Sequence, residues 1–171
     1  MSELLDILPD RIEQAARALL KTACDRDLAI VTAESCTGGL LASLLTDVEG
    51  ASRAFERGFV VYTDDAKCEL LAVDRDTVER CGAVSRETAI AMVHGAIERS
   101  HGDIAVSITG FAGPGGPDDE PGLVHFGCLR RGGDVVHREE HFGDIGRGPV
   151  RLKCLDVALE MLDRNLEQQI P

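Results

Sequence analysis

Hydrophobic residues return every three or four positions in three stretches of the chain. These stretches cover residues 10–26, the segment that follows Ser85, and residues 149–167. Such spacing places the apolar side chains on one face of a helix, so it predicts three amphipathic helices. Asp10 and Ser85 stand where their side chains can cap the first and second of them. Shorter helices are expected at 39–45, 64–72 and 75–81.

Short apolar runs of strand length alternate with these helices. They cover 28–31, 57–63, 104–108, 123–129 and 135–142. The last two are joined through Gly132-Gly133, which is typical of a hairpin turn. Strands that alternate with helices predict a largely parallel sheet. We therefore expect an α/β fold, namely a three-layer α/β/α sandwich with a mixed, mostly parallel sheet of about five strands. The length suits a single domain over residues 1–171.

Three loops follow the first three predicted strands directly. They are Thr32–Gly39, Tyr62–Lys67 and Thr109–Gly116. In open α/β sheets, ligands bind in the crevice beyond the carboxyl ends of the strands. If the three strands run parallel, these loops meet at one edge of the sheet and form the predicted site.

The first loop contains three candidate nucleophiles, Ser35, Cys36 and Thr37, followed by Gly38 and Gly39. Backbone N–H groups at the start of the following helix can hold an anion or a developing oxyanion. The same pattern is also typical of a hydroxyl helix cap followed by glycines that permit close packing. Taken alone, the segment favours this structural interpretation over catalysis.

The other two loops carry weaker signals. Lys67 becomes a base only where burial lowers its pKa, and a lysine on a turn is more often solvated. The stretch Gly110–Gly116 holds four glycines and a proline, which let a backbone approach a ligand closely or simply form a crossover turn. It matches neither the P-loop nor the dinucleotide-binding fingerprint.

Composition excludes several classes of protein. The net charge is −12, whereas a protein that grips phosphate backbones normally presents a positive face, so we expect no nucleic-acid partner. None of the six cysteines forms a CxxC pair or has zinc-finger spacing. No signal peptide or membrane-spanning run is found, and we expect a cytoplasmic protein with no membrane partner. His137 and His141 fall in one predicted strand and are interpreted as surface or edge histidines, not as a metal pair.

Several blocks in order through the chain resemble the CinA C-terminal domain family of nicotinamide-nucleotide amidohydrolases. The matching blocks are Ala33–Gly39, Phe55–Tyr62 with Ala66-Lys67, Gly82–Ser85 and Thr109–Pro114. The resemblance implies hydrolysis of the carboxamide of nicotinamide mononucleotide to nicotinic acid mononucleotide and ammonia, as part of pyridine-nucleotide salvage. It also implies an α/β/α fold, no cofactor and no required metal, and it makes a homodimer a reasonable expectation.

The resemblance assigns the catalytic roles to Ser35, Tyr62 and Lys67. Ser35 would attack the amide carbon, while Lys67 takes the proton directly or through the hydroxyl of Tyr62. The remaining candidates hold the oxyanion, for which backbone N–H groups near Thr37 and Gly38 are favoured, or hold the rest of the substrate with its phosphate. They are Thr37, Gly38, Gly39, Thr109, Gly110, Gly113, Arg147 and Arg151.

The sequence departs from the family pattern at three places. Tyr62-Thr63-Asp64 stands where the family usually has Tyr-Ser-Asn, and two extra residues precede Arg147. Glu120-Pro121-Gly122 stands where the family often has Lys-Pro-Val-Gly. Two other functions remain open at this level. One is a catalytically silent nucleotide-binding domain that acts as a regulator or partner. The other is a Ser/Lys amidase for a different small amide.

Overall fold

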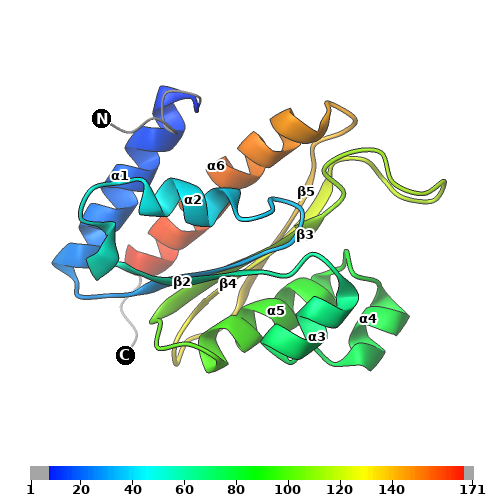
Figure 1. The fold of residues 1–171 in the computed structure, drawn as a ribbon, viewed down its shortest axis with the longest axis horizontal. Coiled ribbons are helices and arrows are strands. Elements are labelled where there is room, and N and C mark those ends of the chain that lie inside the picture. Colours follow the sequence, from blue (N-terminus) through cyan, green and yellow to red (C-terminus); the bar gives the residue numbers. More distant parts are fainter. Residues whose placement is uncertain (1–7, 168–171) are drawn as a thin grey trace.

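A five-stranded mixed sheet forms the centre of the computed structural model, which describes residues 8–167. The strand order is β2-β1-β3-β4-β5 (Figure 1). Strands β1 (Ile30–Glu34), β2 (Phe55–Val60) and β3 (Ile104–Gly110) run parallel to one another. Strands β4 (Leu123–Arg130) and β5 (Val136–His141) are antiparallel and form the expected hairpin. The prediction of a mixed sheet is confirmed.

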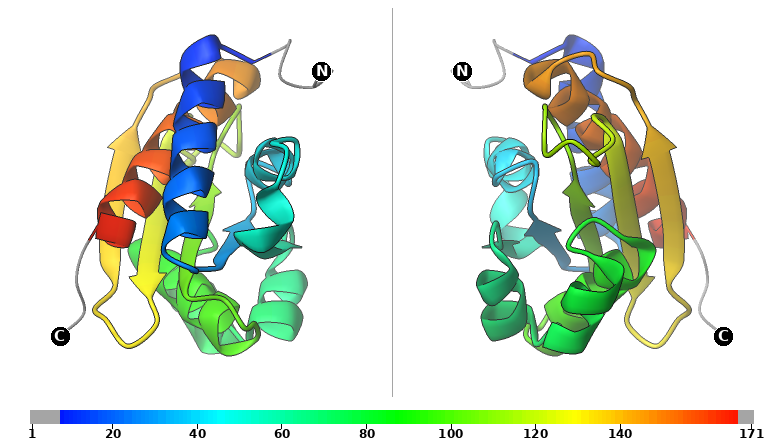
Figure 2. Two further views of the ribbon diagram at one scale, coloured as in Figure 1. Left: turned by 90° about the vertical axis from the view of Figure 1, so that its left-hand side faces the viewer. Right: turned by 90° about the vertical axis from the view of Figure 1, so that its right-hand side faces the viewer.

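Helices cover both faces of this sheet (Figure 2). One face carries α1 (Asp10–Asp25), α2 (Leu40–Thr46) and α6 (Arg147–Glu167). The other carries α3 (Asp64–Leu71), α4 (Arg75–Cys81) and α5 (Arg86–Glu98). A short 3-10 turn, η2 (Ala51–Arg53), precedes β2. The molecule is therefore a three-layer α/β/α sandwich, as the alternation of strands and helices predicts.

Side-chain alternation along the strands creates two separate hydrophobic cores. In β1, Ile30 packs with the α1 and α6 layer, whereas Val31 and Ala33 pack with the α5 layer. Every residue of β1 is buried, and so are all but the last of β3, because both strands lie between two helical layers. The edge strand β5 contains only exposed and half-buried residues. The sequence pattern thus follows the position of each strand in the sheet.

Helix starts agree only in part with the predicted caps. Ser85 caps α5, since its Oγ accepts a hydrogen bond from the N–H of Thr88 at 3.1 Å. The prediction that Asp10 caps α1 is wrong. Pro9 occupies the N-cap position and Asp10 lies in the first turn, where its carboxylate faces the positive end of the helix dipole instead.

The second strand begins and ends earlier than its apolar run predicts. The structure has β2 at Phe55–Val60, whereas the run indicates 57–63. Thr63 is the N-cap of α3 and accepts a hydrogen bond from Ala66 N at 3.1 Å, so the strand must end before it. Within the described part of the chain, no helix has both the length and the hydropathy that crossing a bilayer requires.

Candidate active site

The three predicted loops meet at the carboxyl edge of the parallel strands. Register places Glu34, the last residue of β1, beside Val60 of β2 and Ile108 of β3. The chain segments that follow therefore emerge side by side and surround a cavity of about 250 Å³. Its lining combines all three loops with the start of α6 and the segment before α5. The lining residues are Ser35, Cys36, Tyr62, Lys67, Ala83, Val84, Thr109–Gly115 and Arg147.

A buried carboxylate holds the first loop in place. Glu34 is fully buried at the end of β1, and its two oxygens accept hydrogen bonds from Leu41 N at 3.0 Å and Ala42 N at 2.8 Å. These N–H groups belong to the first turn of α2, whose N-cap Gly39 has no side chain to offer. Glu34 thus ties the strand to the helix and closes the loop that carries Ser35. No local sequence signal indicates this role, because Glu34 stands several residues before the N-cap Gly39, outside the positions from which side chains usually cap a helix.

Ser35 and Lys67 form the central contact of the cavity. Lys67 donates a hydrogen bond from Nζ to Ser35 Oγ at 3.2 Å, and both side chains are buried, with Ser35 7% and Lys67 1% exposed. The lysine comes from the first half of α3, which begins directly after the strand that lies beside β1. Residues 32 positions apart are thereby brought within hydrogen-bond distance.

Burial lowers the pKa of the Lys67 ammonium below its usual value, and the nearby carboxylate of Asp64 offsets part of this effect. A buried lysine is costly when charged because it has left water without gaining a full set of partners. Here the ammonium finds the Ser35 hydroxyl and, at 3.5 Å, the backbone carbonyl of Tyr62. The lysine is therefore biased toward its neutral, basic form beside a hydroxyl.

Tyr62 contributes in a different way from the one expected. Its backbone carbonyl faces Lys67, whereas its side chain is 61% exposed. Tyr62 is one of the residues that line the cavity. The direct contact between Ser35 and Lys67 is thus already formed, while no hydrogen bond of the Tyr62 hydroxyl to either residue is found within residues 8–167.

The third loop closes the opposite wall. Thr109 donates a hydrogen bond from Oγ1 to the carbonyl of Ala83 at 2.7 Å, which joins the end of β3 to the segment before α5. A Cβ on Gly113 would lie 3.1 Å from a guanidinium nitrogen of Arg147, so glycine here lets that side chain approach the loop. Arg147 is exposed and brings positive charge to the cavity wall.

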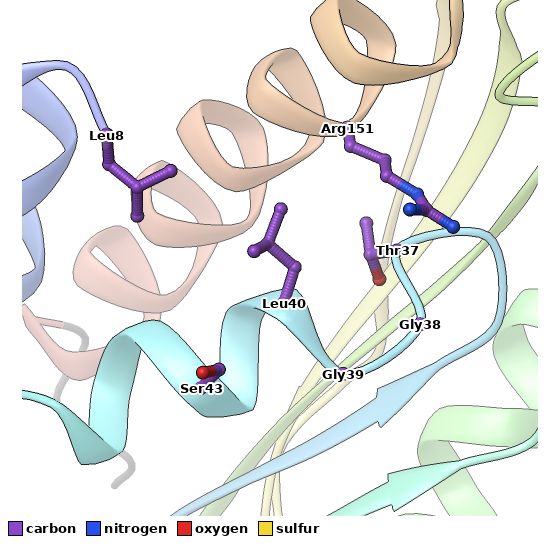
Figure 3. Close-up of a pocket in the computed structure, with 7 residues that line it drawn as sticks. All are labelled: Leu8, Thr37, Gly38, Gly39, Leu40, Ser43 and Arg151. Carbon is purple, nitrogen blue, oxygen red and sulfur yellow. The ribbon is translucent and has the colours of Figure 1, made fainter. Parts of the chain in front are cut away.

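The predicted substrate-binding residues are divided between two hollows. Thr37, Gly38, Gly39 and Arg151 line a second hollow of about 410 Å³ on the other side of the first loop (Figure 3). Arg151 reaches from α6 toward Gly38 and donates a hydrogen bond from Nε to the carbonyl of Cys36 at 2.8 Å. The hydroxyl of Thr37 is buried and finds no partner within residues 8–167.

The three candidate nucleophiles are now distinguishable by their surroundings. Only Ser35 is hydrogen-bonded to Lys67. Cys36 is buried, and its interaction with Cys154 of α6, together with burial, raises the pKa of the Cys154 thiol. Thr37 faces the second hollow. The prediction that the Gly38 N–H binds an oxyanion is wrong, because this group donates to the carbonyl of Ser35 at 3.1 Å. Across the described residues, the backbone N–H groups of Cys36 and Thr37 donate to no protein acceptor, and of the two residues only Cys36 lines the cavity.

Comparison with known proteins places this arrangement in a family. The profile of the CinA C-terminal domain matches residues 12–166. Nicotinamide-nucleotide amidohydrolase PncC of Escherichia coli (strain K12) is 40% identical over 164 residues, which make up 94% of this chain and 93% of that protein. A CinA-like protein of Akkermansia muciniphila is 48% identical over 121 residues, or 70% of this chain and 29% of that protein. The chain thus corresponds to less than a third of this longer relative.

Solved structures agree in both fold and sequence. Competence/damage inducible protein CihA from Agrobacterium tumefaciens superposes with a TM-score of 0.91 at 47% identity, covering 95% of this chain and 99% of that one. A CinA superfamily protein from Escherichia coli superposes with a TM-score of 0.83 at 37% identity, covering 88% of each chain. On the profile, the relatives and the shared structure, the chain belongs to the CinA C-terminal domain family.

Proposed function

We propose that this protein hydrolyses the carboxamide of nicotinamide mononucleotide to nicotinic acid mononucleotide and ammonia. The observation that carries the proposal is the buried contact of 3.2 Å between Lys67 Nζ and Ser35 Oγ at the edge of the cavity. A hydroxyl beside a desolvated amine is the arrangement that an amide-cleaving nucleophile needs. The relative named nicotinamide-nucleotide amidohydrolase, which aligns over nearly the whole chain, supports this choice of amide.

In the proposed mechanism, Ser35 Oγ attacks the carboxamide carbon while its proton passes to the neutral amine of Lys67. The carbonyl π electrons move onto oxygen, and the N–H group of Cys36, which lines the same cavity, holds this oxyanion. When the tetrahedral intermediate collapses, Lys67 returns the proton to the leaving nitrogen, and ammonia departs. Water, deprotonated by Lys67, then attacks the acyl-enzyme. As this second intermediate collapses, Lys67 returns the proton to the leaving Ser35 Oγ, and the acid product ionises to the carboxylate by losing a proton to solvent.

The substrate itself contributes to the activation of the base. The pyridinium ring of the mononucleotide carries a positive charge, and a cation near Lys67 disfavours its charged form further. In our proposal the exposed ring of Tyr62 packs against the pyridinium at the mouth of the cavity, where a cation–π contact is available. Arg147, beside Gly113 on the cavity wall, pairs with the phosphate.

Binding of the phosphate in the second hollow is the main variant of this proposal. Arg151 offers a guanidinium there. That hollow lies behind the Ser35 loop, and the catalytic contact faces the cavity that contains Arg147. A single mononucleotide must place its amide on Ser35 in that cavity, so we assign its phosphate to Arg147.

Ammonia release from nicotinamide mononucleotide by the purified protein tests the function. We expect turnover in the unmodified protein, a loss of about 10³-fold or more in Ser35→Ala, and unchanged turnover in Ser52→Ala, an exposed serine far from the cavity lining. Absence of turnover in the unmodified protein would refute the function. Binding of the mononucleotide without ammonia release would identify a silent nucleotide-binding domain instead.

Two further results would revise parts of the proposal. Full turnover in Ser35→Ala would keep the reaction but reject Ser35 as nucleophile. Equal kcat/KM for the mononucleotide and for free nicotinamide would show that the phosphate is not recognised, as expected for an amidase of another small amide.

A further inference from the structure

A second group of chemically active side chains lies on the β4–β5 hairpin, outside the cavity of the candidate active site. Glu139 of β5 is the direct cross-strand partner of His125 of β4, and His137 is the partner of Gly127. Positions two apart in a strand share a face. The three polar side chains therefore project from the same face of the hairpin, the one that α5 covers in part.

Their donor atoms converge. His125 Nδ1 lies 3.1 Å from His137 Nε2 and 3.6 Å from Glu139 Oε2. Within residues 8–167, this is the one group of three or more histidine, cysteine or carboxylate donors whose atoms all lie within 4.8 Å of one another. Two nitrogen ligands about 2.0–2.1 Å from a tetrahedral ion stand about 3.3–3.4 Å apart. The separation of the two imidazole nitrogens is close to that value, so only small side-chain rotations are needed to admit an ion.

Surrounding groups orient this cluster. His141 Nε2 contacts the other oxygen of Glu139 at 2.9 Å, and His141 Nδ1 contacts Glu120 Oε1 at 2.6 Å. A carboxylate ligand is thus held by a neighbouring imidazole, which is in turn held by a second carboxylate. Support of this kind from outside the ligand set is typical of protein metal sites.

Burial also favours the uncharged form of the two imidazoles. Burial is the main cause that lowers the pKa of both His125 and His137, against the opposing attraction of Glu139 and Glu87. For His137, Arg86 and the neighbouring His125 lower the pKa further. Neutral imidazoles present the lone pairs that a metal ion requires.

We propose that His125, His137 and Glu139 bind one divalent ion of the zinc class, with a water molecule in the fourth position. Two imidazoles and one carboxylate suit zinc and its neighbours, whereas magnesium and calcium prefer oxygen ligands throughout. The ion would link β4 to the edge strand β5 through side chains in addition to their backbone ladder. The inference is independent of the proposed amidase function, because none of its ligands lines the cavity.

Zinc titration of the chelator-treated, reduced protein tests this site. We expect one equivalent of Zn²⁺ to bind with a Kd at or below about 10 μM, and the binding to weaken at least about tenfold in His137→Gln and in Glu139→Gln. Glu139 is exposed, so its replacement leaves the fold intact. His101→Gln, which removes an exposed histidine elsewhere on the surface, serves as the matched control and keeps the affinity of the unmodified protein.

Cobalt distinguishes this site from the free thiols. Cys24, Cys36, Cys68, Cys81, Cys128 and Cys154 are all free, and some are accessible to metals. We expect Co²⁺ to give the visible bands of a four-coordinate nitrogen and oxygen site, without thiolate charge transfer. Absence of stoichiometric zinc binding, an unchanged Kd in His137→Gln, or a thiolate charge-transfer band would each overturn the proposal. The first of these results would leave His125 and His137 as a hydrogen-bonded pair only.

Discussion

Replacing Lys67 with methionine should abolish turnover and, at the same time, make the folded protein more stable. Methionine is similar in length and fills the same buried volume, but it carries no charge and accepts no proton. The lysine ammonium contacts one hydroxyl and one carbonyl, at 3.2 Å and 3.5 Å, although it has three N–H donors to satisfy. The native fold therefore carries the cost of a poorly solvated amine in order to keep a base beside Ser35.

The expected magnitudes follow from these contacts. Loss of a general base costs about 10²–10⁴-fold in kcat. Replacement of a buried charge by an apolar side chain of similar volume stabilises by about 1–3 kcal/mol. In a domain of this size each kcal/mol raises Tm by about 2–4 °C.

The stability gain depends on pH in a direction set by the lowered pKa of Lys67. The folded protein binds this proton less tightly than the unfolded chain, so the lysine destabilises the fold most at pH values below its folded pKa, where both states are charged. Between the folded pKa and the ordinary value of 10.5, the folded lysine is neutral while the unfolded lysine is still charged. The penalty therefore shrinks as pH rises through this window and disappears once both states are neutral. Lys67→Met should thus gain most at acid and neutral pH and least in alkaline solution.

Urea unfolding at several pH values, together with ammonia release from nicotinamide mononucleotide, measures both effects. The control is Lys21→Met, since Lys21 is exposed on α1 and pairs with Asp25 at the surface. In the unmodified enzyme, kcat/KM should fall as pH drops through the folded pKa of Lys67. A variant that is inactive but also less stable at neutral pH would show that Lys67 is a structural residue, and would refute the idea that the fold sacrifices stability to keep a base beside Ser35.

Three further changes have expected outcomes. Glu34→Ala leaves two N–H groups of α2 without their acceptor and should lower the free energy of unfolding by about 3 kcal/mol in urea titration, with no loss expected if the loop is held by other contacts. Gly95→Ala would place a Cβ 1.9 Å from the carbonyl oxygen of Leu71 and should cost about 3 kcal/mol, whereas Gly148→Ala, with open space around it, should cost far less. Arg147→Met should raise KM for nicotinamide mononucleotide about tenfold with little change in kcat, and should leave hydrolysis of free nicotinamide unchanged; an unaltered KM would move the phosphate to the second hollow.

The order of helices and strands could be derived from the sequence because each element shows its own periodicity. The stripe of α1 and the cap of α5 are local properties, and both are observed. The bounds of β2 differ from the prediction because its first residues are half-buried and polar in part, while the apolar run continues past the strand toward Thr63. An apolar run in the sequence indicates which residues are buried. It does not indicate where the backbone hydrogen bonds between strands begin or end.

The candidate site was only partly predictable for a related reason. The three loops were located by their position after strands, and parallel pairing does bring them together. The division of the loop after β1 between two hollows was not foreseen. Ser35 and Cys36 line the catalytic cavity, whereas Thr37–Gly39 line the second hollow, and a turn in the backbone separates the two groups. The convergence of His125 with Glu139 was also missed, since it depends on the register of the hairpin.

By itself, the sequence determined the layer architecture, the family and the segments from which the site is built. These depend on periodicity and on short motifs, which are properties of neighbouring residues. Tertiary structure decided which nucleophile meets the lysine, that the lysine is buried, and that Glu34 fastens the loop between them. The physical reason is that a pKa and a hydrogen bond depend on distance and desolvation, and for residues 32 positions apart only the packed fold sets either quantity.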